Sequence, residues 1–158
     1  MKRFARIVVS LCLLILPAFG QSSPTNIYAV GASWNPGASP AFAGSALYAH
    51  AVDSSGTFAF TQLDILPASL KPFTVVSNVS AGVAQKALTV KGVNFYIPGS
   101  AGVSFTGQNV GWAWSSGVIA SVRVKSFRIM PNVRFLKSSV NNGAGYQLIP
   151  GLLFGWGQ

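Results

Sequence analysis

The sequence predicts an all-β protein: an antiparallel, up-and-down transmembrane β-barrel of about eight strands that follows a cleaved signal peptide. Three observations predict it. Charged residues make up only 8% of the chain, against roughly 25% in ordinary soluble domains. Apolar and small residues alternate with a period of two in segments of about ten residues. No segment after residue 20 offers the long continuous apolar run that a membrane-spanning helix needs.

The first twenty residues have the organisation of a signal peptide. Lys2, Arg3 and Arg6 form a basic head, residues 7–16 form an apolar run, and the small residues Ala18 and Gly20 suit signal peptidase. We expect cleavage between Gly20 and Gln21. The run is too short to cross a bilayer as a helix, which makes an uncleaved anchor the weaker alternative.

Residues 21–158 then form one domain. Cys12 is the single cysteine and falls within the signal peptide, so disulfide bonds cannot hold the mature fold. Removing three of the eleven Lys and Arg leaves eight cations against Asp53 and Asp64, a formal charge of +6. Hydrogen bonding and packing must therefore stabilise the domain.

Nine candidate strands follow from the pattern, and clusters of turn-forming residues separate them. The candidates are 26–34, 41–52, 57–66, 72–84, 87–97, 103–115, 118–126, 128–137 and 145–156. The expected turns are 35–40, 53–56, 67–72, 98–102, 115–117 and 141–143. Single-chain bacterial barrels have an even number of strands, so one assignment must be wrong. The weakest are 103–115, which Gly107 interrupts, and the junction near Ser126. We expect eight strands, with ten as the alternative.

The alternation assigns opposite faces to neighbouring residues. Tyr28, Val30, Ala32 and Trp34 share one face of the first strand, and Ala29, Gly31 and Ser33 share the other. The same pattern sets Val118, Ala120, Val122 and Val124 opposite Ser121, Arg123 and Lys125. A soluble β-sandwich also alternates, but two acidic residues cannot supply its water-facing surface. A lipid-facing exterior explains the shortage of charge.

The C-terminal residues carry a resemblance to a known family. Gly151, Phe154 and Trp156 resemble the terminal assembly signal of small bacterial outer-membrane β-barrel proteins, in which two aromatic residues at alternate positions follow a glycine. Ile149 and the extension Gly157-Gln158 depart from that pattern. The resemblance implies insertion into the bacterial outer membrane by the barrel assembly machinery, with outer-membrane lipid as the surroundings.

Catalytic and metal-binding chemistry find little support. His50 is the single histidine, and Asp53 follows at a spacing that places the two on opposite faces of a strand. A serine hydrolase using His50 is therefore the weak alternative, and a residue at a strand end or rim is the preferred interpretation. One histidine and two acids cannot assemble a metal site of three or four strong ligands. No cofactor is implied.

Basic residues gather near the end of the chain. Arg123, Lys125, Arg128, Arg134 and Lys137 lie within fifteen positions. The first four are candidate anion contacts in the lumen or at its rim, where an unpaired cation needs water, Asp53, Asp64 or a bound anion. One hypothesis is that these cations bind the phosphate groups of lipopolysaccharide, and the simpler one is that water in the lumen solvates them. Nucleic-acid binding is not expected, because the pattern lacks a basic surface interleaved with aromatic residues.

We therefore expect a monomeric outer-membrane barrel with a structural or envelope-integrity role and no catalysis. A small porin-like conduit for anionic or small polar solutes is the first alternative, since Arg123 and Lys125 would favour anions in a lumen. A secreted β-sandwich or adhesin subunit is the second, and an enzyme using His50 is the third.

Overall fold

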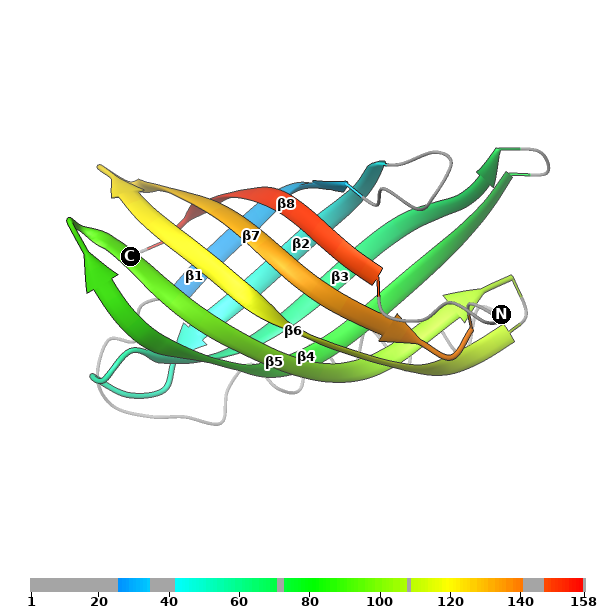
Figure 1. Ribbon diagram of the computed structural model, residues 1–158, viewed down its shortest axis with the longest axis horizontal. Helices are drawn as coiled ribbons and strands as arrows, with labels where there is room; N and C mark the ends of the chain where they lie inside the picture. Colours follow the sequence, from blue (N-terminus) through cyan, green and yellow to red (C-terminus); the bar gives the residue numbers. More distant parts are fainter. Residues whose placement is uncertain (1–25, 35–41, 71–72, 108, 141–146, 158) are drawn as a thin grey trace.

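The structure, a computed structural model, describes residues 26–34, 42–70, 73–107, 109–140 and 147–157. Eight strands make up almost all of these ranges (Figure 1). They are β1 (Asn26–Trp34), β2 (Phe42–Ala51), β3 (Thr57–Leu70), β4 (Phe73–Val90), β5 (Val93–Thr106), β6 (Asn109–Val124), β7 (Phe127–Ser138) and β8 (Gln147–Trp156). The signal peptide predicted for residues 1–20 lies outside the described residues and stays a prediction.

The strands form one closed barrel in sequence order, and every neighbouring pair is antiparallel. The last strand closes the sheet by pairing with the first, in a register that sets Tyr28 opposite Trp156 and Ser33 opposite Gly151. The prediction of an eight-stranded up-and-down barrel is confirmed. The β-sandwich alternative is wrong, because a single sheet closes on itself instead of stacking on a second one.

The barrel has two distinct ends, because strands run alternately up and down. One end carries the start of β1, the end of β8 and the connections 52–56, 91–92 and 125–126; we call it the terminal end. The opposite end carries the connections 35–41, 71–72, 107–108 and 139–146. Figure 1 shows the C-terminus beside the β4–β5 and β6–β7 hairpins, on the left.

Several predicted strand boundaries are wrong in the middle of the chain. The candidate 87–97 joins the end of β4 to the start of β5, and the true turn between them is Lys91-Gly92, where both residues have positive φ. The expected turns at 98–102 and 115–117 lie inside β5 and β6, and the expected turn at 67–72 begins inside β3. Two glycines in these stretches allow close strand packing, because a Cβ on Gly102 would overlap the backbone oxygen of Val79 and a Cβ on Gly117 would overlap that of Val133.

Two of the weak assignments are resolved. The candidate 103–115 is divided at Gly107 between β5 and β6, as its interruption suggested. The junction near Ser126 is a real turn, in which Lys125 adopts a φ of 58°. The turn was hard to predict because a lysine occupies a conformation that usually favours glycine or asparagine.

The two faces of the strands follow the predicted alternation. Val118 is 48% exposed on the outside of β6, whereas Ser121 is 3% exposed inside the barrel. In β1, Tyr28, Val30 and Trp34 lie outside and Ala29 and Ser33 inside. The inward residues fill the interior, as expected for a barrel of eight strands.

The interior has three layers between the two ends. An apolar cluster near the terminal end contains Phe60, Met130 and Leu47 among its buried members. A second apolar cluster near the opposite end contains Leu66, Leu136 and Ala43. On β2, β3 and β7 the inward residues between the two clusters are polar, so a buried polar layer separates two apolar ones.

Candidate functional site in the barrel lumen

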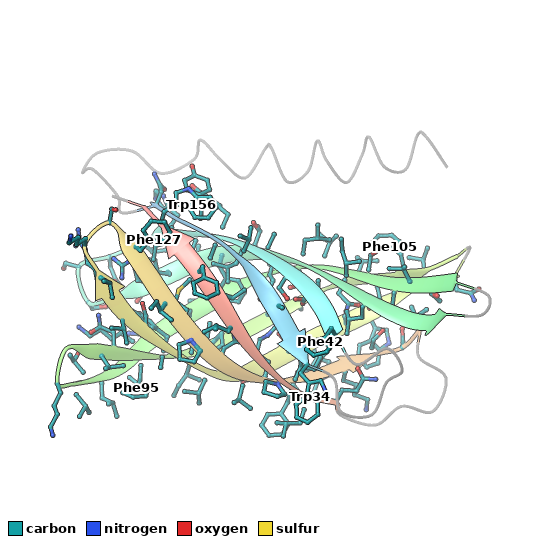
Figure 2. The ribbon with its side chains drawn as sticks, turned by 90° about the horizontal axis from the view of Figure 1, so that it is seen from above. Trp34, Phe42, Phe95, Phe105, Phe127 and Trp156 are labelled. Carbon is teal, nitrogen blue, oxygen red and sulfur yellow. The ribbon has the colours of Figure 1, made fainter. Side chains whose placement is uncertain are left out.

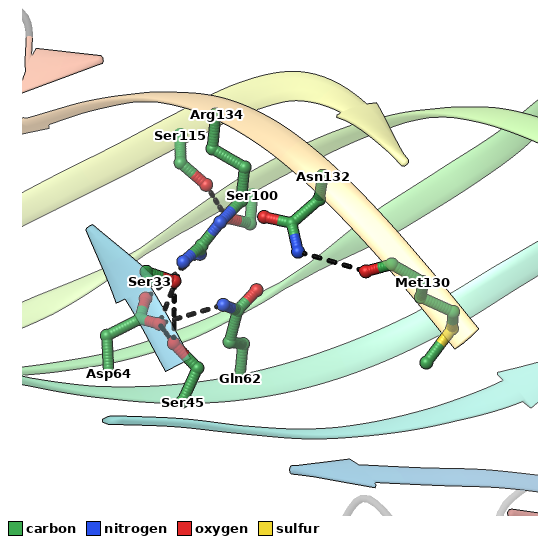
Figure 3. A network of polar contacts seen from close by, with 9 residues as sticks. All are labelled: Ser33, Ser45, Gln62, Asp64, Ser100, Ser115, Met130, Asn132 and Arg134. Carbon is green, nitrogen blue, oxygen red and sulfur yellow. Dashed lines mark hydrogen bonds and ion pairs between the residues drawn. The ribbon is translucent and has the colours of Figure 1, made fainter. Parts of the chain in front are cut away.

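Asp64 of β3 is the centre of the polar layer (Figure 3). Strand alternation aims Gln62 and Asp64 inward, between the apolar side chains Phe60 and Leu66. Arg134 reaches Asp64 from β7, on the other side of the lumen, although 70 positions separate the two in sequence. The closed sheet therefore brings together one acid and one base that no local pattern links.

The contact between Asp64 and Arg134 is bidentate. Arg134 Nη1 donates to Asp64 Oδ2 at 3.0 Å, and Nη2 donates to Oδ1 at 2.9 Å. Asp64 Oδ1 also accepts hydrogen bonds from Ser45 Oγ at 2.6 Å and from Gln62 Nε2 at 2.9 Å. Ser33 Oγ lies 3.3 Å from Ser45 Oγ and extends the network to β1. Four strands are thus joined across the lumen.

Burial makes this network important for the fold. Asp64 is 4% exposed and Arg134 is 5% exposed. A buried charge is costly unless a partner and hydrogen bonds compensate it, and fork-shaped Arg–carboxylate pairs are the strongest such contacts. Removing either partner would leave the other charge buried and uncompensated. The pair therefore holds the middle of the lumen together.

Smaller polar contacts continue the layer around the barrel. Ser104 donates to Asn78 Oδ1, and Ser138 Oγ donates to Ser104 Oγ at 2.7 Å. Ser100 and Ser115 join β5 to β6 through a contact of 2.8 Å between their hydroxyls. Some polar atoms remain without a hydrogen-bond partner among the described residues, including Arg134 Nε and Asn78 Nδ2. The layer is therefore polar throughout but not completely satisfied by the protein.

The four predicted anion contacts do not all come together, although Arg123 and Arg128 lie opposite each other in the register of β6 and β7. Arg134 lies in the middle of the barrel and pairs with Asp64, which the sequence analysis had considered as a partner for Arg123 and Lys125 instead. Arg123, Lys125 and Arg128 lie at the terminal end, where Arg123 Nε donates to the backbone oxygen of Lys125 at 3.1 Å. Arg128 is half-buried at the mouth of the lumen. A role for these three residues in binding anions stays a prediction.

His50 and Asp53 have different hydrogen-bond partners, and Asp53 lies in the turn beyond β2, where strand alternation no longer applies. His50 is near the end of β2, and its Nδ1 lies 2.8 Å from Asn26 Oδ1. Asp53 instead organises the turn to β3: its Oδ1 accepts hydrogen bonds from Thr57 N at 2.9 Å and from Ser55 N at 3.0 Å. These contacts, that of Thr57 foremost, lower the pKa of Asp53 to about 2. Within the described residues, no group of three His, Cys, Asp or Glu could hold a metal ion.

The residues that sequence reasoning missed are the polar partners inside the lumen. Ser45, Gln62 and Asn78 were not singled out, and Asp64 was named without Arg134 as its partner. One local signal could have found part of the set, because Gln62 and Asp64 alternate with the apolar residues Leu63 and Ile65. The long-range pairing could not have been found without the closed topology.

The chain matches no protein-family model, and no curated protein is significantly similar to it in sequence. Its fold is similar to that of a major outer membrane protein from Thermus thermophilus, with a TM-score of 0.59, 9% sequence identity, and coverage of 87% of this chain and 100% of that one. It is also similar to Neisserial surface protein A, with a TM-score of 0.53, 11% identity, and coverage of 87% and 97%. A de novo designed transmembrane β-barrel gives a TM-score of 0.50, 13% identity, and coverage of 87% and 99%. The chain has the fold of a small transmembrane β-barrel.

The exterior of this transmembrane barrel suits lipid. Its large outward residues are apolar, and Val30, Leu63, Val133 and Phe154 are typical of the middle of the surface. Lys137 is on the outward face only near the end of β7, where its Nζ lies 5.9 Å from the centre of the Trp112 ring. No helix in the described ranges is long and apolar enough to cross a membrane.

Aromatic side chains gather toward the two ends of the apolar surface (Figure 2). The strand registers place Tyr48, Tyr28, Trp156 and Phe127 in one lateral row across β2, β1, β8 and β7 at the terminal end. Trp34 and Phe42 form a pair near the opposite end. Aromatic residues typically line both interfaces of a transmembrane barrel with water. These rows therefore mark the two edges of the lipid-facing band.

The predicted assembly signal is part of the strand that closes the barrel. Phe154 and Trp156 lie on the outer face of β8, and Gly151 lies on the inner face, close to Ser33 and Asn132. Their recognition by an assembly machinery stays a prediction.

Proposed function

We propose that this barrel is a monomeric protein of the bacterial outer membrane with a structural, envelope-integrity role and no catalytic activity. The observation that carries the proposal is the closed lumen. Two buried apolar clusters and the Asp64–Arg134 layer occupy successive levels of the interior. A barrel of eight strands is just wide enough for its own side chains. Little space is left for a diffusing solute.

The proposed orientation follows from the connections between strands. Outer-membrane barrels typically have short periplasmic turns and longer extracellular loops. The terminal end has connections of five, two and two residues, at 52–56, 91–92 and 125–126, and the opposite end has the two longest connections, 35–41 and 139–146. This comparison supports a periplasmic terminal end. Arg123 and Lys125 would then face phospholipid phosphates of the inner leaflet, and lipopolysaccharide phosphates become the less favoured partner of the two.

A porin-like conduit is the competing function, and the cations at the terminal mouth are the observation that favours it. Conductance across a planar bilayer distinguishes the two functions. We expect the purified barrel to give no stable current steps, because the Asp64–Arg134 layer blocks the lumen. Stable, anion-selective steps from the folded protein would overturn the structural proposal.

The absence of catalysis is tested in a strain that lacks the protein. We expect that strain to admit a large apolar dye faster than its parent, and we expect the intact gene to reverse this. A gene that carries His50→Ala should reverse the faster dye entry equally well, because the hydrogen-bond partner of His50 among the described residues is Asn26. Failure of His50→Ala, with normal amounts of folded barrel in the membrane, would support the enzyme alternative.

Assembly through the C-terminal strand is the final part of the proposal. Phe154→Ala combined with Trp156→Ala should reduce the amount of folded barrel in the outer membrane. Phe127→Ala is the matched control, because Phe127 pairs with Trp156 in the same outward row but lies outside the C-terminal strand. Equal loss in both variants would indicate a general effect of removing surface aromatic residues and would count against the assembly signal.

A further inference from the structure

The terminal half of the lumen contains a cavity that the structural role does not use. It has a volume of about 40 Å³ available to the centres of water-sized spheres. Eleven residues from all eight strands line it, and Phe58, Phe60, Ile119 and Met130 are among the apolar ones. An apolar cavity is a poor site for water, because water needs several polar partners. The walls therefore suit a hydrocarbon group.

Two residues of this wall carry hydroxyl groups, Tyr96 and Ser121, and Ser121 is the more deeply buried of the two. Its side chain is 3% exposed, and its Oγ has no hydrogen-bond partner among the described residues. Nearly all buried hydroxyl groups are hydrogen-bonded, so a buried one without a partner calls for an explanation. The explanation we favour is that the Ser121 hydroxyl donates a hydrogen bond to a polar atom of a bound molecule.

On three strands that line the cavity, a cationic residue lies two positions beyond the lining residue, in the direction of the terminal end. Ala84, Ser121 and Met130 line it, and Lys86, Arg123 and Arg128 are two residues away from them on the same faces of β4, β6 and β7. In each case the step leads toward the terminal end, and two residues of strand cover about 7 Å. Asp53, the acid in the turn at that end, uses its carboxylate for the backbone of its own turn.

Strand β6 shows the resulting gradient most simply. Its inward residues run from Ile119 through Ser121 to Arg123, from an apolar side chain to a hydroxyl to a cation. A molecule with an alkyl end, an oxygen-bearing head and a negative charge matches this order, because its alkyl end fits the apolar side chain, its oxygen fits the hydroxyl and its charge fits the cation. We propose that the cavity binds a short, single-chain anionic amphiphile through the terminal mouth, with its alkyl end against Ile119 and Phe60 and its carboxylate or phosphate head between Ser121, Arg123 and Arg128.

The size of the cavity limits the chain. A volume of 40 Å³ for water-sized centres corresponds to roughly three water positions. Only a short alkyl chain fits without rearrangement, although Met130 has the flexibility to widen the space. We therefore use six-carbon compounds as probes.

Met130 offers a direct readout, because the chain contains only two methionines, Met1 and Met130. The barrel is labelled with ¹³C-methyl methionine in nanodiscs of zwitterionic phosphatidylcholine, and Met130→Leu identifies the Met130 signal. Hexanoate, hexyl phosphate, hexanol and hexylammonium are titrated separately. We expect a saturable shift of the Met130 methyl with at least one of the two anions, and affinity for hexanol at least about tenfold weaker, a difference of about 1.4 kcal/mol. Comparison of hexanoate with hexyl phosphate tells a fatty-acid head from a phosphate monoester.

Variants separate the head contacts from the cavity. Arg123→Gln combined with Arg128→Gln should reduce the affinity for the anions to that for hexanol. Ala84→Leu, which fills the cavity, should abolish the saturable shift. Lys137→Gln removes a cation at the opposite end and should leave binding unchanged. A shift in gel mobility on boiling confirms that each variant is folded.

Three results would overturn the proposal. The first is a shift that grows without saturation for both anions, which indicates partitioning into lipid alone. The second is equal affinity for hexanol and the better-bound anion in the unaltered barrel, a comparison that requires no variant to fold. The third is unchanged anion affinity in a folded Arg123→Gln, Arg128→Gln barrel.

Discussion

Asp64 and Arg134 show how much one contact across the lumen contributes at the scale of single residues. Either residue alone would be an unfavourable charge inside an apolar barrel, and together they make two hydrogen bonds of 2.9 and 3.0 Å. The pair links β3 to β7, which are not neighbours in the sheet. The pair therefore fixes the distance between two opposite walls of the barrel, whereas the backbone hydrogen bonds fix only the spacing of neighbouring strands.

Removal of one partner should be more harmful than removal of both. We expect Asp64→Ala to lower the free energy of unfolding by about 3–5 kcal/mol, because Arg134 is left buried without its partner. The double variant Asp64→Leu, Arg134→Met should lose much less, because it exchanges a buried ion pair for apolar packing. Urea unfolding in lipid vesicles measures both. An Asp64→Ala barrel as stable as the unaltered protein would show that water reaches the pair freely.

The carboxylate of Asp53 should make the β2–β3 turn sensitive to acid. Hydrogen bonds from Thr57 and Ser55 lower the pKa of Asp53 from 3.8 to about 2 in the folded protein. A lowered pKa means that the charged form stabilises the fold, fully above pH 3.8, and that this contribution is lost as the pH falls toward 2. NMR titration of the Asp53 carboxyl carbon should therefore give a midpoint near 2. A midpoint at or above 3.8 would contradict the turn geometry.

Predictability from sequence differs sharply among individual residues. The inward or outward direction of Tyr28, Val30 and Ser33 could be predicted, because alternation is a local property of a strand. The partner of Arg134 could not be predicted, because it depends on which strands face each other across the closed lumen. The different contacts of His50 and Asp53 could not be predicted from their spacing, because β2 ends at Ala51 and Asp53 lies in the turn that follows.

At the scale of strands, small residues were the main source of error. Pro98, Gly99 and the sequence Ser115-Ser116-Gly117 resemble turns but lie inside β5 and β6. Gly117 allows β6 to pack closely against β7, because a Cβ there would overlap the carbonyl oxygen of Val133, whereas a Cβ on Gly99 would meet no atom within 4 Å. A Cβ placed on Gly82 of β4, for example, would lie 2.7 Å from Ser100 Cα of β5 and overlap the carbonyl oxygen of Gly99.

Two glycines on neighbouring strands test this interpretation. We expect Gly82→Ala to destabilise the barrel by about 1–3 kcal/mol, the usual cost of overpacking. Gly99→Ala is the matched control and should be nearly neutral, because a Cβ there meets no atom within 4 Å. Denaturant unfolding in vesicles gives the comparison. Equal stability of the two variants would mean that β4 and β5 can separate without cost.

At the scale of the whole molecule, the sequence was a good guide to architecture. The shortage of charge and the period of two predicted a closed, lipid-facing barrel, because those properties are required around the entire surface. The three-layered interior was not predicted, because single polar residues on separate strands carry no sign that they lie at one level. The apolar cavity likewise depends on residues from all eight strands.

The closed sheet should make unfolding of the barrel all-or-none and resistant to mild detergent. We expect the folded protein to migrate on a cold detergent gel differently from the boiled protein, with no intermediate species. Asp64→Ala should lower the temperature at which the mobility changes. A gradual change of mobility with temperature would contradict cooperative closure of the sheet.

The pairing of β8 with β1 also has a consequence for biosynthesis. Until the ten residues of β8 arrive, β1 and β7 each present an edge of unpaired backbone N–H and C=O groups, which neither hydrocarbon nor neighbouring strands can satisfy. A nascent chain that stops before residue 147 therefore cannot form a stable structure within a bilayer. Completion of β8 is therefore the step that decides whether a newly made chain can form a stable barrel in the membrane.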